Sequence, residues 1–426
     1  MVEVSRRDIM LGTTAAGVAG ATSQAVAQGA AQGGAATAPI DRLLRQAVEA
    51  KQVAGVVALA ATDQGPVYQG AFGKRSLVPG AADMTMDSVF WIASMTKAIT
   101  STAAMQMVEQ GKLGLDQPIG TVLPELASAQ VLEGFDAAGA PQLRSARRPI
   151  TLRHLLTHTA GFTYDIWDAN TARYEKLTGI PSIITCKDAA LRKPLAFDPG
   201  DRWDYGINID WAGKAVERVS GQKLGTYFQQ HLFAPLGMAS TSFRLSPSQR
   251  ARLVGMHARQ PDGALNPIEF ELPQDPEFKM GGGGLYSTAA DYMKFCQVFL
   301  HAGRAEGGAQ VLRPETVALM SQNQMGDLKV TNLKTIDPAS SLDAEFFPGM
   351  AKTWSTAFMI NTAEAPTGRS AGSLAWAGLG NTYFWIDPRR RVAGVILMQL
   401  LPFADGPALQ AFAGFETATY KALPAA

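Results

Sequence analysis

Two serines in this chain are each followed three residues later by a lysine, a spacing that could give a nucleophile its own base. The two segments are Ser94-Met95-Thr96-Lys97 and Ser220-Gly221-Gln222-Lys223. On a helix, residues three apart lie on one face, about a turn from each other. A serine attacks an ester or amide carbonyl once a neighbouring group takes its proton. The spacing is short enough to arise by chance, so its surroundings must decide.

The surroundings favour Ser94 over Ser220. Ser94 follows the apolar stretch 89–93 and opens an expected helix over about 94–110, in which apolar residues recur every four positions. Free N–H groups at a helix start favour a developing oxyanion, and partial burial lowers the pKa of an ammonium such as Lys97. The alternative is an ordinary capping serine with a surface lysine. Ser220 instead lies where one helix ends, with Gly221 as the cap and Lys223 expected in solvent.

A second serine motif, Gly-x-Ser-x-Gly, occurs at 368–372 in a context that does not suit it. This motif needs a buried strand before the serine and a helix after it. Here a polar loop, 361–367, precedes Ser370 and a strand-like segment follows. In that fold the catalytic histidine also lies after the serine, whereas the last histidine of this chain is His301. We expect Ser370 to be non-catalytic.

Metal or organic cofactors are not expected. The chain has five His and two Cys without paired-ligand spacing. His154 and His158 are four apart, as in a zinc protease, but Leu155 stands where that motif carries its glutamate base. Cys186 and Cys296 are expected to be two buried free thiols, because an exported protein that folds in a reducing compartment does not require a disulfide.

Charge and the N-terminus bear on partners and location. The formal net charge is +1, which offers no basic surplus for nucleic acid. An arginine pair, Arg6-Arg7, precedes a weakly apolar stretch and an Ala-x-Ala site at 25–27. These three parts in order predict a twin-arginine signal at 1–27, a linker at 28–38 and export to the periplasm or medium by the twin-arginine machinery. The apolar stretch is too short for stable membrane insertion.

Strand-like segments occur at both ends of the chain. A hairpin is expected over 53–61 and 67–72, and four further strands over 356–360, 374–377, 382–386 and 392–399. Residues 387–390 make the turn between the last two strands, and a helix closes the chain from about 408. The pattern predicts an α/β domain from 39–120 and 286–426, with a mainly helical domain over 121–285.

Several segments, taken in order, resemble the serine β-lactamase-related hydrolases over roughly residues 40–420. This family includes class C β-lactamases, DD-peptidases and family VIII carboxylesterases, and the chain is most similar to the last group. The resemblance implies a central antiparallel sheet flanked by helices, plus a mainly helical domain. The matching segments are Phe90–Lys97, Leu155–Gly161, Pro199-Gly200 leading into Tyr205, Gly281–Thr288, and Trp376–Gly378 with Asp387-Pro388.

The resemblance implies that Tyr205 hydrogen-bonds Ser94 and Lys97 and shuttles a proton to the leaving group. A phenolate-like Tyr205 is physically reasonable, because a neighbouring ammonium favours the charged phenol. The family motif is Tyr-x-Asn, yet Ile207 occupies the amide position here and Asn208 is displaced by one. Asn208 is the candidate that could replace it in contacting a substrate carbonyl.

The family's Lys-Thr-Gly strand reads Trp376-Ala377-Gly378 in this chain. A lysine there would bind the carboxylate of β-lactams and peptidoglycan stems, and Trp376 cannot. Trp376 is expected to line the pocket and to favour neutral, hydrophobic substrates, as in family VIII esterases. Gly378 would let the substrate backbone approach closely, and the Leu379 N–H would form the oxyanion hole with that of Ser94.

These features predict a serine carboxylesterase that cleaves neutral short-chain or hydrophobic esters through an acyl-enzyme on Ser94. Its partner would be a small-molecule ester. The alternatives within the family are β-lactamase or DD-peptidase activity, amide hydrolysis and acyl transfer to an alcohol. A protein that is acylated without turnover, such as a penicillin-binding protein, is the alternative outside enzyme function.

Overall fold

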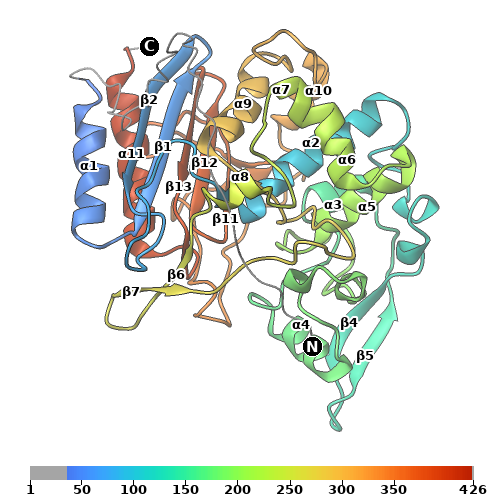
Figure 1. Cartoon of the computed structure of the whole chain (residues 1–426). Helices are drawn as coiled ribbons and strands as arrows, with labels where there is room; N and C mark the ends of the chain where they lie inside the picture. The colour runs from blue at the N-terminus through green and yellow to red at the C-terminus, as the bar shows by residue number, and fades with distance from the viewer. Residues whose placement is uncertain (1–35, 425–426) are drawn as a thin grey trace, which may run out of the picture.

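A seven-stranded antiparallel sheet built from both ends of the chain forms the centre of the molecule (Figure 1). The computed structural model describes residues 36–424. The strand order is β2-β1-β13-β12-β11-β10-β9, and every neighbouring pair is antiparallel. This confirms the expected fold class. The strands are β1 (Gly55–Thr62), β2 (Gly65–Gly73), β9 (Lys352–Trp354), β10 (Met359–Asn361), β11 (Leu374–Gly378), β12 (Thr382–Asp387) and β13 (Val392–Leu397).

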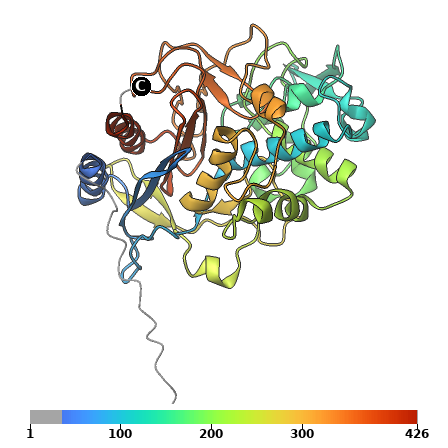
Figure 2. The same cartoon turned by 90° about the horizontal axis from the view of Figure 1, so that it is seen from above.

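Helices cover both faces of this sheet. Helices α1 (Ala38–Glu49) and α11 (Gly406–Ala422) lie side by side on one face, and α9 (Ala289–Leu300) packs against β1, β12 and β13 on the other (Figure 2). Because both faces are covered, β12 and β13 are buried along their whole length and consist almost entirely of apolar runs. The edge strand β2 alternates buried and partly exposed residues instead.

The helix that follows Ser94 runs through the interior. Helix α2 (Thr96–Glu109) is buried through Met107 and packs on α5 (Asn208–Ser220). Small and apolar residues occur on all faces of this helix, which is the pattern expected for a helix buried in a large core. The helix expected over 94–110 is therefore confirmed, except that its start is a separate 3-10 turn, Ala93–Met95.

The segment between α2 and α9 contains two hairpins that the sequence did not predict. They are β4 (Gln130–Phe135) with β5 (Pro141–Ser145), and β6 (Met256–Arg259) with β7 (Leu265–Ile268). The domain boundaries stay a prediction. Other elements are β3 (Phe90–Trp91), β8 (Tyr286–Ser287), β14 (Leu400–Leu401), α3 (Leu152–Leu156), α4 (Ala169–Thr178), α6 (Leu224–Phe228), a π-turn (Gln229–Phe233), α7 (Ala234–Leu236), α8 (Pro247–Arg250) and α10 (Pro314–Met320).

The predicted signal, 1–27, and the linker up to residue 35 lie outside the described residues. Among residues 36–424, no helix combines the length and the apolar character needed to cross a membrane. Cys186 and Cys296 are both buried and free, which confirms the expectation of two thiols.

Candidate active site

Ser94 lies in the middle of the 3-10 turn that joins β3 to α2. Backbone pairing holds this turn in place, because β3 pairs with β8 and the Ile92 N–H donates to the carbonyl of Leu285 at 3.0 Å. Ala93, directly before the serine, has a φ of 43°, in the left-handed region that a residue with a Cβ rarely adopts. Such backbone strain persists where the surrounding structure enforces it, and it gathers at functional sites.

Lys97 lies in the first turn of α2 with its side chain fully buried. Its Nζ donates to Ser94 Oγ at 3.2 Å, to the Tyr164 hydroxyl at 3.0 Å and to the carbonyl of Gly282 at 2.6 Å. Burial lowers the pKa of Lys97 to about 7, although the nearby Asp210 carboxylate acts in the opposite direction. A substantial fraction of the protein therefore carries the neutral Lys97 amine near pH 7, and this form can accept a proton from Ser94.

Tyr164 is a member of this cluster that sequence reasoning missed. Its hydroxyl accepts the hydrogen bond from Lys97, and it also lines the cavity beside Ser94. Burial raises the pKa of Tyr164 well above its usual value, so the phenol stays protonated. Its one sequence signal is its position, three residues after the matching segment Leu155–Gly161.

Tyr205 meets the same cluster from the loop before α5. Its hydroxyl is hydrogen-bonded with Ser94 and accepts a bond from Trp376 Nε1 at 2.8 Å, and Lys97 Nζ lies 4.6 Å from its ring centre. Burial raises the pKa of Tyr205 well above its usual value, while the bonds from Ser94 and Trp376 lower it in part. The expected phenolate is therefore not favoured: desolvation outweighs the two hydrogen bonds, and Tyr205 carries a proton that it can donate.

Asp210 is a second residue that sequence reasoning missed. Its side chain is buried on α5, and its Oδ1 accepts the Gly282 N–H at 2.8 Å. The same glycine presents its carbonyl to Lys97, so the backbone of one residue connects the carboxylate to the amine. A Cβ at Gly282 would lie 2.5 Å from Asp210 Oδ2, and therefore the close packing requires glycine. Burial raises the pKa of Asp210, whereas Lys97 lowers it.

The strand opposite Ser94 is β11, as the resemblance implied, but Trp376 has a different position from the one expected. It is buried behind Tyr205, with ring centres 4.8 Å apart, and it also packs on Trp354 at 4.6 Å. In the described part of the chain it is not among the residues that line the cavity at Ser94. Trp376 thus holds the Tyr205 hydroxyl rather than forming the pocket wall.

Gly378 and Leu379 lie at the end of β11, next to the turn that carries Ser94. A Cβ at Gly378 would lie 2.3 Å from the Ile92 carbonyl oxygen, so this glycine lets two backbones approach closely within the protein itself. Leu379 and Ser94 line the same cavity. This placement brings the two residues of the expected oxyanion hole to one side of the cavity, although the hole itself stays a prediction.

Asn208 lies away from the cavity. It is the first residue of α5 and is fully buried, with its Nδ2 3.2 Å from His158 Nδ1 and donating to the Phe162 carbonyl at 3.1 Å. Its side chain is committed to the protein interior. These interior bonds do not favour the contact with a substrate carbonyl that was expected of Asn208.

Ser370, His154 and His158, for which the sequence predicted no catalytic or metal-binding role, make contacts within the protein. Ser370 lies in the loop between β10 and β11. Its N–H donates to Asp387 at 2.9 Å and its carbonyl accepts from Asn361, and these bonds hold the loop in place. His154 caps α3, accepting the Thr151 N–H at its Nδ1. His158 packs against the ring of Tyr205, 4.6 Å away between ring centres.

A cavity of about 250 Å³ opens beside Ser94. Its walls are mainly apolar and aromatic. Residues lining it are Trp91, Ala93, Ser94, Tyr164, Asp165, Ile166, Trp167, Ser182, Ile183, Ile184, Phe270, Met280, Gly282, Gly283, Asp337, Ser340, Leu379 and Leu401. Concave, mostly apolar sites with a few polar groups are typical for small organic ligands.

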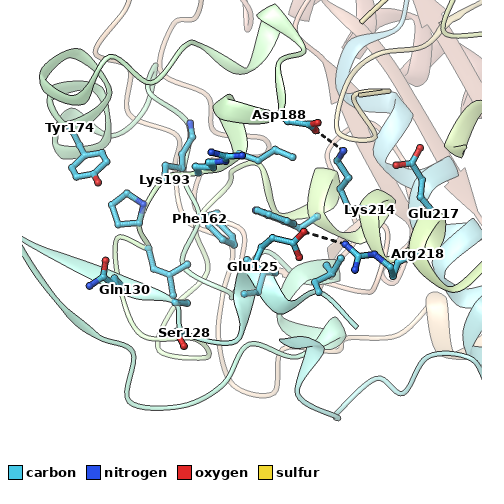
Figure 3. A pocket seen from close by; sticks show the side chains of 18 of the residues that line it. Glu125, Ser128, Gln130, Phe162, Tyr174, Asp188, Lys193, Lys214, Glu217 and Arg218 are labelled. Atoms are coloured by element: carbon cyan, nitrogen blue, oxygen red, sulfur yellow. Dashed lines mark hydrogen bonds and ion pairs between the residues drawn. The ribbon is translucent and has the colours of Figure 1, made fainter. Parts of the chain in front are cut away.

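A larger cavity of about 820 Å³ lies between α5 and the loops that precede β4 and follow α4 (Figure 3). Its walls carry charged side chains that pair with one another: Lys214 with Asp188 at 2.6 Å, and Arg218 with Glu125 at 3.2 Å (Figure 3). In the described structure, Ser94, Lys97 and Tyr205 do not line it. The larger cavity is therefore not the reactive one, because the nucleophile Ser94 lines the smaller cavity.

A serine hydrogen-bonded to a buried amine and a phenol, beside a strand of an antiparallel sheet, defines a serine enzyme site of the Ser-x-x-Lys type. Comparison with known families agrees with this class. The chain matches the beta-lactamase family over residues 40–418 and belongs to it. The resemblance noted in the sequence is thereby confirmed.

Curated relatives and solved structures extend this similarity. The chain is 32% identical to a monacolin J acid methylbutanoyltransferase of Aspergillus terreus, over 89% of this chain and 95% of that one. It is also 32% identical to a lovastatin esterase of Penicillium rubens, over 86% and 94%. The structure of a simvastatin synthase from Aspergillus terreus superimposes with a TM-score of 0.79 at 29% identity, covering 91% of this chain and 98% of that one.

Proposed function

We propose that this protein is a serine carboxylesterase that cleaves neutral short-chain or hydrophobic esters through an acyl-enzyme on Ser94. The observation that carries the proposal is the buried Lys97 amine, 3.2 Å from Ser94 Oγ and beside a largely apolar cavity. A nucleophile, a base close to neutrality and a dry pocket are what acyl transfer from an ester requires. The esterase and acyltransferase names of the relatives support the same class of reaction.

The Lys97 contacts suggest how the base acts. After the ammonium loses a proton, its two remaining N–H bonds satisfy the Gly282 carbonyl and the Tyr164 hydroxyl, which leaves the lone pair for the Ser94 O–H. Ser94 then attacks the ester carbonyl and Lys97 takes its proton. The backbone N–H groups of Ser94 and Leu379 hold the oxyanion.

Tyr205 completes the cycle as the acid. Because its phenol stays protonated, it donates to the leaving alkoxide and then recovers from Lys97 the proton that Lys97 took from Ser94. Trp376 fixes the position of its hydroxyl. Water then attacks the acyl-enzyme and releases the carboxylic acid. The reaction as proposed needs no metal or organic cofactor.

β-Lactamase and DD-peptidase activity receive less support. Their substrates carry a carboxylate, for which a lysine on the strand facing the nucleophile would be the partner. Trp376 occupies that place, and the charged side chains of the cavity lining within the described residues are the carboxylates of Asp165 and Asp337. Like charges repel an anionic substrate in a site of low dielectric.

Acyl transfer to an alcohol is a second candidate, favoured by the transferase among the relatives. Both reactions share the acyl-enzyme and differ in whether water or an alcohol attacks it. Product analysis in the presence of a hydrophobic alcohol separates them: an ester product in excess of the free acid would assign the chain to acyl transfer.

The test of the proposed function compares wild type with Ser94→Ala on p-nitrophenyl butyrate and on nitrocefin. We expect turnover of the ester by wild type, loss of at least about a thousandfold in the variant, and slow or no nitrocefin turnover. Equal ester rates would refute the site. Fast nitrocefin turnover alone would favour a β-lactamase, and an acyl adduct that persists for hours would favour a binding protein.

We also propose export through the twin-arginine pathway, based on residues 1–27 alone. The sequence observation is Arg6-Arg7 ahead of a weakly apolar stretch and the Ala-x-Ala site. Replacing both arginines by lysine in the full chain is expected to retain the precursor in the cytoplasm, as cell fractionation would show. An exported and processed variant would contradict this.

A further inference from the structure

The walls of the cavity at Ser94 combine aromatic faces with negative charge. Trp91 and Phe270 pack together with ring centres 4.7 Å apart, and Tyr164 and Trp167 with centres 5.8 Å apart. All four rings line the cavity. Faces of such rings attract organic cations, and quaternary ammonium groups are the ligands for which aromatic walls are best known.

The negative charge comes from two loops that are joined at the cavity. The Ile336 N–H donates to the Ile166 carbonyl at 3.0 Å, and Trp167 Nε1 donates to Ser341 Oγ at 3.1 Å. Asp165 directly precedes Ile166 in the sequence, and Asp337 directly follows Ile336. Both carboxylates are half-buried and line the cavity. The fold therefore places two acidic side chains on one side of the site.

These two carboxylates are not neutralised by cations of the protein. Within residues 36–424 neither forms an ion pair, and the Lys97 amine donates instead to Ser94, Tyr164 and Gly282. Asp165 is also hydrogen-bonded to the side chain of Glu175, which raises the pKa of Glu175, and Glu175 is in turn paired with the buried Lys193. The exposed Lys176 does not line the cavity at Ser94, but it lines an adjoining outer recess that Asp165 and Asp337 line as well.

We propose that this cavity selects esters that carry a quaternary or protonated ammonium group, held between the aromatic walls and Asp165 and Asp337. The inference rests on the proposed esterase function and changes its preferred substrate from a neutral to a cationic ester. A neutral ester makes only apolar contacts with the cavity walls. A cationic ester is also attracted by the aromatic faces and the two carboxylates, whereas the carboxylates repel an anionic ester. Asp165 and Asp337 are then specificity-determining residues.

The experiment uses three esters of matched size: butyrylcholine, its uncharged isostere 3,3-dimethylbutyl butyrate, and a butyrate ester of similar length ending in a carboxylate. Acid release is followed in a pH-stat with wild type, Asp165→Asn, Asp337→Asn and the double variant. The readout is the ratio of kcat/KM for the cationic ester to that for the neutral ester. Asp327→Asn, an exposed carboxylate that does not line the cavity, is the matched control.

For wild type we expect kcat/KM to be highest for the cationic ester, lower for the neutral ester and lowest for the anionic ester. Each cavity substitution should lower the cationic-to-neutral ratio about fivefold, the upper range for a partly exposed charge pair, and Asp327→Asn should leave the ratio unchanged. Added salt should lower the ratio in wild type more than in the double variant. A ratio of one or less in wild type, or one that the cavity variants do not change, would overturn the inference while leaving the esterase intact. Failure to cleave any of the esters above the Ser94→Ala rate would refute the esterase function and this inference with it.

Discussion

Lys97 has to be neutral to take the proton of Ser94, and its surroundings make that state accessible. Burial removes the solvation of the ammonium, whereas the Asp210 carboxylate and the Gly282 carbonyl partly replace it. The balance sets the pKa of Lys97 near 7. A surface lysine would remain charged at this pH and would be a poor base.

The first prediction concerns the pH dependence of turnover. Since only the neutral amine accepts a proton, kcat/KM for p-nitrophenyl butyrate should rise with pH through about 7 and then level off. The fraction of neutral Lys97 is lost as the pH falls below that value. A profile that is flat from pH 5 to 9 in wild type would argue against Lys97 as the base.

The second prediction assigns Asp210 a positioning and electrostatic role. Asp210→Asn keeps an oxygen for the Gly282 N–H but removes the negative charge that raises the pKa of Lys97. We expect the rising limb of the pH profile to move to lower pH. Asp210→Ala, which also removes the hydrogen bond, should lower kcat in addition. A purely structural residue would lower kcat in both variants without moving the limb.

At the scale of elements, the meeting of β11 with the turn before α2 sets the geometry of the site. The Cα of Gly378 faces the Ile92 carbonyl, and Thr382 Oγ1 on β12 donates to the same oxygen at 3.4 Å. This contact fixes how far Leu379 lies from Ser94. A pocket built on strand ends is more rigid than one built on loops alone.

The third prediction tests this contact with Gly378→Ala. The added Cβ would lie 2.3 Å from a backbone oxygen, so one of the two segments has to shift. A displacement of about 1 Å near the nucleophile should lower kcat/KM about a hundredfold. Gly307→Ala is the control, because a Cβ there meets open space. Unchanged turnover by Gly378→Ala would show that the close approach is not needed.

The fourth prediction concerns the attachment of α11 to the sheet. Arg369 and Glu416 form a buried two-bond ion pair, at 2.5 Å and 2.8 Å. Glu416→Ala would leave the guanidinium buried without a partner, and the free energy of unfolding in urea should fall by about 3–5 kcal/mol. For the exposed pair Lys334–Asp343, the variant Asp343→Ala should lower the free energy of unfolding far less, because solvent screens an exposed pair. Equal losses would contradict this ranking.

For the whole molecule, the sequence predicted the parts of the fold whose pattern is local. The strands β1, β12 and β13 are buried on both faces and therefore read as apolar runs. The hairpins β4–β5 and β6–β7 were missed because β5 and β7 are largely exposed and lack that pattern. Burial, rather than intrinsic strand propensity, made the difference between the two groups.

In the candidate site, too, the sequence predicted the contacts between residues that are close along the chain. Ser94 and Lys97 share one turn, so their spacing in sequence predicted their contact. Tyr164 is 67 residues from Lys97, and only the fold brings them together. The directions of side chains were also beyond sequence reasoning: Asn208 and Trp376 are near the site but turn into the core.

The most direct test of the central claim is to locate the acyl group. Wild-type protein is treated with a fluorophosphonate or rapidly quenched during turnover of p-nitrophenyl butyrate, and the modified peptide is sequenced by mass spectrometry. We expect one adduct, on Ser94, and none in Ser94→Ala. An adduct on Ser370 or Ser220, or an equal adduct in the variant, would contradict the assignment of Ser94 as the nucleophile.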